Sequence, residues 1–365
     1  MKKAKAEPPF YPRGMATGIG SLPFEDPDEA LALILSECPE CPHWPQLPRR
    51  GPKEHFIHQF LHPLVECGLL VYPSDRWLFD MSRDACAGDL TMFYSTALAA
   101  EEGDPEALQT FLPSPESAAG FHAFLTQAGN DASLEKAAHL KGQIAGPLSV
   151  ALELKDEQGR PAYYRDDLRD VIVRNLALNA RAQAKALSAL GRPAIVFVDD
   201  PGVGACGSWS HLALSRETIQ EDLRAIFRAI RAEDSLCGVH ACEAVDWSLL
   251  MESGPDILSV DVYRFGSSLV PYAGDLHAFL EQGGTVAWGI APTLDDPFSE
   301  TAESLVQRLH RLWKKLFPNP GDRDRVMRHS MITPACGTGL LSEAQARRIY
   351  RLTAEVSLRI REQAG

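Results

Sequence analysis

Long apolar runs are absent from this chain of 365 residues. No stretch of 18 or more apolar residues occurs, so the sequence predicts no membrane-spanning helix and no membrane partner. Residues 1–14 are basic, but no apolar core follows them, so they do not read as a signal peptide. We therefore expect a cytoplasmic protein whose eight cysteines stay reduced, either as small buried hydrophobic residues or as metal ligands.

Basic runs interleaved with aromatic residues are missing as well. The formal net charge is −13, and a surface this acidic cannot neutralise phosphates along a nucleic acid, so no nucleic-acid partner is expected. Hydrophobic residues make up 45% of the chain and charged residues 23%, which is the composition of an ordinary globular protein.

Apolar segments alternate with amphipathic ones about eight times along the chain. The run 194–198 is wholly apolar, which is typical of a parallel strand buried on both faces. This alternation predicts an α/β fold, a (β/α)8 TIM barrel with helical and loop insertions. We expect a flexible N-terminal arm over 1–14 and one catalytic barrel over 15–365, with an insertion loop at 38–54 and the second strand near 69–72. An open doubly wound sheet is the alternative, but the first turn lacks the glycine fingerprint of a dinucleotide-binding fold.

Polar residues stand where the predicted strands end. In the stretch 237–243 an imidazole and a thiol lie two positions apart, so in an extended segment both point to the same side and can reach one ion. A barrel gathers its strand ends at one mouth, and the polar residues there are Ser21, Asp199, Asp200, His240, Cys242, Asp261 and Cys336. Four of them form a mixed N, S and O set that zinc accepts in tetrahedral geometry, namely His240, Cys242, Asp261 and Cys336.

Each of these residues also has an ordinary structural interpretation. A histidine at a strand end is often only hydrogen-bonded, a lone cysteine often fills the core, and an aspartate after a strand often caps the next helix. The pair Cys38 and Cys41 has spacing suited to zinc, but no second pair lies nearby in the sequence, and the closest further cysteines are Cys67 and Cys86.

Several short motifs carry a resemblance to a known family. They are Ile19-Gly20-Ser21, Gly146-Pro147, Val198-Asp199-Asp200-Pro201, His240-Ala241-Cys242, Ser259-Val260-Asp261 and Thr333-Pro334-Ala335-Cys336-Gly337. Taken in this order, which is the family's own, the chain resembles the catalytic C-terminal barrel of cobalamin-independent methionine synthase, within the uroporphyrinogen decarboxylase-like superfamily. The motifs span nearly the whole chain, and the His-x-Cys with the late Pro-x-Cys-Gly is their most specific part.

The resemblance implies roles for particular residues. Zinc would be held by His240, Cys242 and Cys336, with Asp261 at a position where the family has the longer glutamate. Backbone groups of Ile19, Gly20 and Ser21 and the carboxylate of Asp199 would hold the amino-acid part of a homocysteine-like thiol. Asp200, which also replaces a family glutamate, is a further candidate substrate-binding residue.

The function that the resemblance implies is zinc-dependent methyl transfer to a thiol such as homocysteine. The family's N-terminal folate-assisting barrel is expected to be missing, and short single-barrel relatives take the methyl group from a methylated corrinoid protein, so such a protein is the expected partner. Two alternatives stay open: a metal-independent decarboxylase of the related barrel type, and a zinc barrel acting on another thiol. A corrinoid carrier is a poor match, since the pattern begun by Asp275 and His277 has Leu280 in place of glycine.

Overall fold

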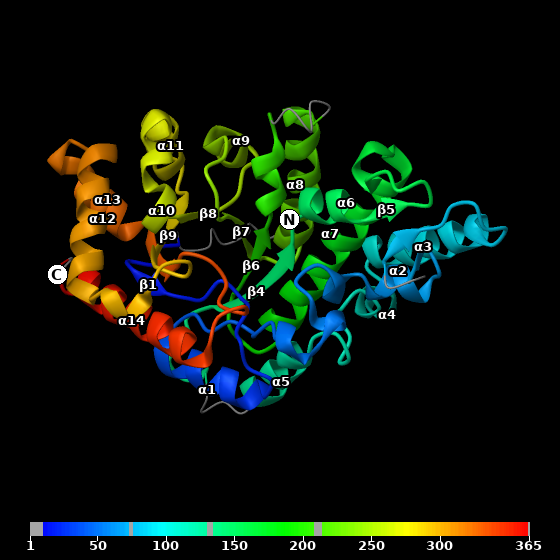
Figure 1. The fold of residues 1–365 in the computed structure, drawn as a ribbon, viewed down its shortest axis with the longest axis horizontal. Coiled ribbons are helices and arrows are strands. Elements are labelled where there is room, and N and C mark those ends of the chain that lie inside the picture. Colours follow the sequence, from blue (N-terminus) through cyan, green and yellow to red (C-terminus); the bar gives the residue numbers. More distant parts are fainter. Residues whose placement is uncertain (1–9, 73–75, 130–133, 208–213, 364–365) are drawn as a thin grey trace, which may run out of the picture.

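The computed structural model describes residues 10–72, 76–129, 134–207 and 214–363 (Figure 1). Its centre is a sheet of seven strands in the order β1-β10-β9-β8-β7-β6-β4, and every neighbouring pair is parallel. The strands are β1 (Met15–Ala16), β4 (Leu140–Ala145), β6 (Ala194–Asp199), β7 (Leu236–Ala241), β8 (Ile257–Asp261), β9 (Thr285–Ala291) and β10 (Ser330–Pro334). From β4 to β10 each strand is added on the same side of the last, without the reversal of a doubly wound sheet.

Helices follow the strands and cover the sheet, as the alternation of segments predicts (Figure 1). The helices are α1 (Pro27–Glu37), α2 (His62–Glu66), α3 (Cys86–Glu101), α4 (Pro105–Gln109), α5 (Ala119–Ala128), α6 (Pro147–Glu153), α7 (Asp166–Ser188), α8 (Arg216–Arg231), α9 (Trp247–Glu252), α10 (Val262–Phe265), α11 (Ala273–Glu281), α12 (Ala302–Leu316), α13 (Arg323–Arg328) and α14 (Glu343–Glu362). Parallel strands with crossover helices confirm the predicted α/β class.

Local sequence explains these elements. All residues of β6 are buried, as a wholly apolar run between two layers requires. Helix α8 begins after the N-cap Ser215 and buries one stripe of apolar residues, which includes Ile219, Leu223 and Ile226. Within the described part of the chain, no helix is long and apolar enough to cross a membrane.

Residues 42–46 differ from the prediction, which placed them in an insertion loop. They run extended between the two edge strands of the sheet, with parallel bridges from His43 to Lys141 and from Gln46 to Ser21. On one side the N–H of Trp44 donates to the carbonyl of Lys141, and on the other the N–H of Gln46 donates to the carbonyl of Gly20. The segment was missed because its two prolines and mixed polarity hide the apolar pattern of a buried strand.

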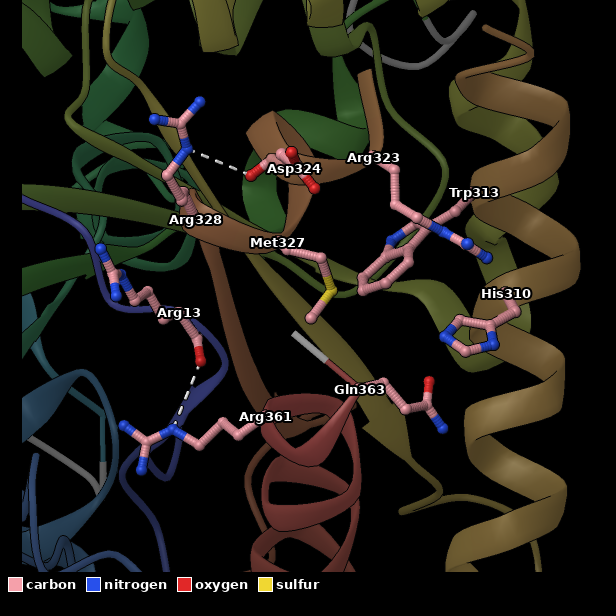
Figure 2. Close-up of a pocket in the computed structure, with 9 residues that line it drawn as sticks. All are labelled: Arg13, His310, Trp313, Arg323, Asp324, Met327, Arg328, Arg361 and Gln363. Carbon is pink, nitrogen blue, oxygen red and sulfur yellow. Dashed lines mark hydrogen bonds between the residues drawn. The ribbon is translucent and has the colours of Figure 1, made fainter. Parts of the chain in front are cut away.

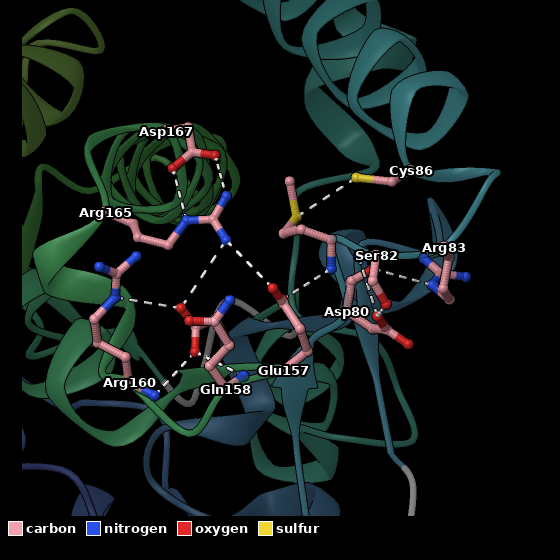
Figure 3. Close-up of polar contacts among 11 residues, drawn as sticks. Asp80, Ser82, Arg83, Cys86, Glu157, Gln158, Arg160, Arg165 and Asp167 are labelled. Carbon is pink, nitrogen blue, oxygen red and sulfur yellow. Dashed lines mark hydrogen bonds and ion pairs between the residues drawn. The ribbon is translucent and has the colours of Figure 1, made fainter.

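The segment predicted as the second strand of the barrel lies elsewhere. Residues 70 and 71 form β2 (Leu70–Val71), which pairs with β3 (Leu78–Phe79) and, through it, with β5 (Lys155–Asp156) in a separate sheet. Polar contacts tie this small sheet to α7: Arg165 pairs with Asp167, Asp156 and Glu157, and the N–H of Met81 donates to Glu157 (Figure 3). The residues between the extended segment 42–46 and β4 therefore form a helical insertion beside the main sheet.

The predicted N-terminal arm is described only in part, because residues 1–9 lie outside the described residues. Residues 10–14 lie against the sheet: the N–H groups of Arg13 and Gly14 donate to the carbonyls of Arg328 and Ser330, and Phe10 packs edge-on against His139. The described end of this segment is thus held beside β10.

Candidate metal centre

Two strand ends place a histidine and two cysteines together. His240 is the penultimate residue of β7, Cys242 follows the end of that strand, and Cys336 follows the end of β10. Each offers one ligand atom, and the three atoms lie within 4.8 Å of one another. Strands β8 and β9 separate β7 from β10 in the sheet, so only the curvature of the sheet can bring Cys336 to the other two residues.

One nitrogen of the His240 ring has no partner. Nδ1 and the hydroxyl of Ser259 form a hydrogen bond of 2.9 Å, which fixes the orientation of the ring. Nε2 is buried and makes no hydrogen bond to any described residue. A fixed ring with its other nitrogen unengaged is the usual arrangement of a metal-binding histidine. Burial lowers the pKa of His240, but the proximity of the Cys242 thiol and the charge of Asp199 outweigh it and raise the pKa overall.

The two thiols lie close together, and each shifts the pKa of the other. A hydrogen bond from Cys336 and the proximity of His240 lower the pKa of Cys242 to about 4, although burial opposes this. The pKa of Cys336 is raised, first because its thiol donates to the Cys242 thiolate and then because it is buried. A thiolate of this kind is both a nucleophile and a soft metal ligand.

Asp261, the predicted fourth ligand, lies at the end of β8 and caps a helix. Its Oδ1 accepts a hydrogen bond of 3.0 Å from the N–H of Arg264 at the start of α10. Burial raises its pKa to about 6, while that backbone bond and the proximity of His240 lower it. Its carboxylate does not belong to the group of three close ligand atoms, so its role as a ligand stays a prediction.

Asp199 ends β6 at the same edge of the sheet, and its register partner on β7 is His240. The carboxylate is buried, and its Oδ1 has no hydrogen-bond partner among the described residues. Burial raises the pKa of Asp199, while the nearby Lys141 and His240 lower it. An unengaged carboxylate oxygen beside the three ligands suits the predicted role in holding a cationic group.

In the structure, the carboxylate of Asp200 is already engaged by other residues of the protein. It is fully buried, and its carboxylate accepts hydrogen bonds from the N–H groups of Leu148 and Ser149 and from the Ser149 hydroxyl, at 2.6–3.0 Å. Both oxygens are therefore engaged at the N-terminus of α6, which they cap. The predicted contact of Asp200 with substrate would require these bonds to break.

The segment Ile19, Gly20 and Ser21 lies at the same end of the sheet. Its three carbonyls accept hydrogen bonds from Lys141, Gln46 and Thr338 respectively. Gly20 is needed here because a Cβ would lie 2.5 Å from Oε1 of Gln46. The protein thus engages the carbonyls, which leaves the N–H groups as the part of this segment suited to a substrate carboxylate.

The sequence interpretation missed two polar residues inside the sheet. Lys141 and Gln143 alternate on β4 and are both buried, with Nζ of Lys141 donating to the carbonyl of Ile19 at 2.5 Å and to Oε1 of Gln143 at 3.2 Å. Burial lowers the pKa of Lys141 to about 8, and Asp199 partly offsets this. A lysine and a glutamine two positions apart in an otherwise apolar strand are a signal that could have been used.

A separate cavity of about 840 Å³ lies at the opposite end of the sheet, among residues that precede β1 and β10 (Figure 2). It is lined by Arg13, His310, Trp313, Arg323, Asp324, Met327, Arg328, Arg361 and Gln363. In α/β barrels the chemistry sits at the carboxyl ends of the strands, so this cavity is not part of the candidate centre. The cysteine pair Cys38 and Cys41 is buried in packed apolar clusters, and all eight cysteines are free thiols.

Comparison with known proteins gives a likeness in structure only. No protein-family model matches the chain, and no curated protein matches it. A B12-independent methionine synthase from Shewanella sp. W3-18-1, solved in complex with selenomethionine, is similar with 18% identity and a TM-score of 0.45, over 66% of this chain and 67% of that chain. A putative vitamin-B12-independent methionine synthase from Listeria monocytogenes is similar with 14% identity and a TM-score of 0.44, over 67% and 69% of the two chains.

Proposed function

We propose that this chain is a zinc-dependent methyltransferase that moves a methyl group to a thiol such as homocysteine. The observation that carries the proposal is the convergence of His240, Cys242 and Cys336 at the carboxyl ends of the strands. The donor set fits zinc, because an unengaged imidazole nitrogen and two adjacent thiols are the N and S ligands that this ion takes. The motif resemblance points to the same chemistry.

Each residue of the proposed centre has its own role. His240, Cys242 and Cys336 would hold the ion, with Asp261 as the proposed fourth ligand. When bound there, zinc supplies the positive charge that keeps a coordinated substrate sulfur deprotonated and nucleophilic at neutral pH. Ser259 keeps the His240 ring in position. A carboxylate is the ligand best suited to leave as the substrate thiol arrives, since Asp261 already has a second partner in the N–H of Arg264.

The amino-acid part of the substrate would be held beside the ligands. The free oxygen of Asp199 is placed to accept hydrogen bonds from the substrate ammonium. The N–H groups of Ile19, Gly20 and Ser21 suit its carboxylate. Lys141, buried near Asp199, would balance the negative charge of that aspartate before the substrate binds.

The fold that supports this site is, in our proposal, a closed (β/α)8 barrel formed by residues 15–365 as one domain. Residues 42–46 would act as its second strand, since their backbone is hydrogen-bonded to both edges of the seven-stranded sheet. Residues 1–14 would then be an arm outside the barrel. A cytoplasmic location goes with this function, because the thiols of the centre must stay reduced to bind metal.

The test of the function combines metal analysis with a methyl-transfer assay. Protein purified without chelator is expected to contain zinc near one equivalent at this centre, and to methylate homocysteine. A metal-free protein that decarboxylates a tetrapyrrole would favour the alternative reaction. Zinc with methylation of a different thiol would keep the mechanism and change the acceptor.

The methyl donor is expected to be a corrinoid. Transfer to homocysteine from methylcobalamin, as a stand-in for a methylated corrinoid protein, should be faster than transfer from a methylfolate at equal concentration. The initial rates of methionine formation with the two donors measure this directly. A faster reaction with the methylfolate would overturn the assignment of the donor and leave the thiol-binding centre untouched.

Replacing Asp199 with asparagine should weaken binding of the amino-acid thiol. Loss of a charge-assisted hydrogen bond costs about 1.5–3 kcal/mol, so KM for homocysteine should rise about 10- to 100-fold. Zinc content should stay unchanged. A matched control is a substrate thiol without an amino group, whose kinetics the Asp199→Asn change should leave alone. Equal KM values for homocysteine in the two proteins would remove Asp199 from substrate binding.

A further inference from the structure

A second group of potential metal ligands lies outside the centre described above. It consists of His55, His58 and Glu153, each of which offers one ligand atom, and these atoms lie within 4.8 Å of one another. His55 and His58 belong to the insertion that follows residues 42–46, and Glu153 is the last residue of α6. We propose that these three residues form a second binding site for a divalent first-row transition ion such as zinc.

The contacts within the group are already close to those of a metal site. Nε2 of His58 lies 2.8 Å from Oε1 of Glu153, and the rings of His55 and His58 have centroids 4.5 Å apart. Ligands held about 2.0–2.2 Å from one zinc ion lie roughly 3–3.6 Å apart, so modest side-chain rotation would complete the set. Two imidazoles and one carboxylate are a common ligand set for zinc and for ferrous iron.

An ordinary ion pair between His58 and Glu153 accounts less well for these contacts. Nδ1 of His58 is buried and has no hydrogen-bond partner among the residues that the structure describes. A buried nitrogen left in this state costs about 1–3 kcal/mol. A charged His58 ring would also lie against the ring of His55, which has no carboxylate partner of its own among the ion pairs of the described chain. A metal ion removes the second cost because it binds neutral imidazoles, and it also removes the first cost if Nδ1 of His58 is the ligand atom.

The environment favours the neutral form of the His55 ring. Burial, followed by the proximity of His58, lowers the pKa of His55, and Glu153 only partly offsets this. Trp77 lies next to His58 with centroids 6.0 Å apart, and Tyr72 packs on Trp77 at 4.5 Å. This aromatic wall covers one side of the group, while the side chain of Glu153 is 40% exposed and leaves a route for the ion.

The position of the site suggests what the ion would do. Glu153 belongs to the short helix whose N-terminus Asp200 caps, and both histidines belong to the helical insertion. An ion held by all three would fasten the insertion to α6. Three protein ligands also leave at least one coordination position for water or an exchangeable ligand.

The test separates the two sites by their ligands. Dialysed full-length protein is titrated with Zn²⁺ and with Co²⁺, whose near-ultraviolet charge-transfer band reports on thiolate ligands. We expect two equivalents to bind, of which only one gives the thiolate band. His58→Ala and His55→Ala should each lose the equivalent without the band and keep the other. The matched control is His62→Ala, which removes a nearby histidine paired with Glu66 outside the group.

A variant that lacks the thiolate centre shows whether the second equivalent binds independently of it. In the Cys242→Ser/Cys336→Ser protein, one equivalent of Zn²⁺ should remain, and Zn²⁺ should still raise Tm if circular dichroism shows a native fold. Absence of that equivalent in this folded background, or its survival in the His55→Ala/His58→Ala double variant, would overturn the second site. Absence of the thiolate band in the unmodified protein would instead count against the proposed function and leave the second site untouched.

Discussion

Replacement of Cys336 by serine is expected to remove zinc from the thiolate centre and to abolish methyl transfer. The hydroxyl of serine is a poor zinc ligand, so the change removes one of the two thiolates and leaves His240, Cys242 and the proposed ligand Asp261 as a weaker set. Charge stabilisation by a metal ion is worth several kcal/mol, so activity should fall on the order of 10³-fold. Metal analysis of the purified variant and the rate of methionine formation measure the two effects.

The other two ligands should behave in the same way. His240→Ala and Cys242→Ser are each expected to lose the same equivalent of zinc, because the proposed function has His240, Cys242 and Cys336 bind one ion. Cys206→Ser is the matched control, since Cys206 is a free thiol that lies outside the group. If any two of the three ligand variants retained stoichiometric zinc at this centre, the assignment of ligands would be wrong.

Replacement of Asp200 by alanine is expected to cost stability and to leave zinc in place. The change leaves the N–H groups of Leu148 and Ser149 and the Ser149 hydroxyl without their acceptor in a fully buried position. Unsatisfied buried donors cost about 1–3 kcal/mol each, so we expect a loss of about 3 kcal/mol or more in the free energy of unfolding. Urea denaturation measures it as a lower midpoint with an unchanged slope.

An exposed cap provides the comparison for this result. Asp26 caps α1 by accepting from the N–H of Asp28 at 2.9 Å, and Asp26→Ala should cost only about 1 kcal/mol. A Cβ at Gly146 would lie 2.1 Å from the Cβ of Asp200, so Gly146→Ala should reproduce the large loss. Should Asp200→Ala instead leave stability intact and raise KM alone, the predicted substrate contact of Asp200 would be restored.

The regular part of the fold could be predicted from the sequence because its signals are local. The apolar run 194–198 and the stripe of α8 each indicate one element without reference to any other. The extended segment 42–46 could not be found in this way. Residues 42–46 are held by Ser21 and Lys141, which lie far apart in the sequence, and lack a pattern of their own. The apolar residues 69–72 have such a pattern, but they pair in a different sheet.

The candidate centre also has residues that local sequence predicts and residues whose roles depend on tertiary contacts. His240 and Cys242 are two residues apart, so their spacing alone predicted that they bind the same metal ion. Cys336 was predicted from its position at the end of a strand. The capping role of Asp200 depends on Gly146 and Ser149, which approach it only in the folded chain. The burial of Lys141 depends in the same way on the carbonyl of Ile19. Tertiary contacts of this kind are not visible in composition or spacing.

The extended segment 42–46 is held less firmly than the strands of the seven-stranded sheet beside it, so the rim formed by the strand ends is not equally stable all round. The strands from β4 to β10 are joined by ladders of several residue pairs, but this segment is joined to its neighbours by isolated bridges. Its local free energy of opening should therefore be lower than that of the ladders. If the protein admits two reactants of unequal size, as the proposed function requires, we expect the rim to open at residues 42–46 while His240, Cys242 and Cys336 keep their places.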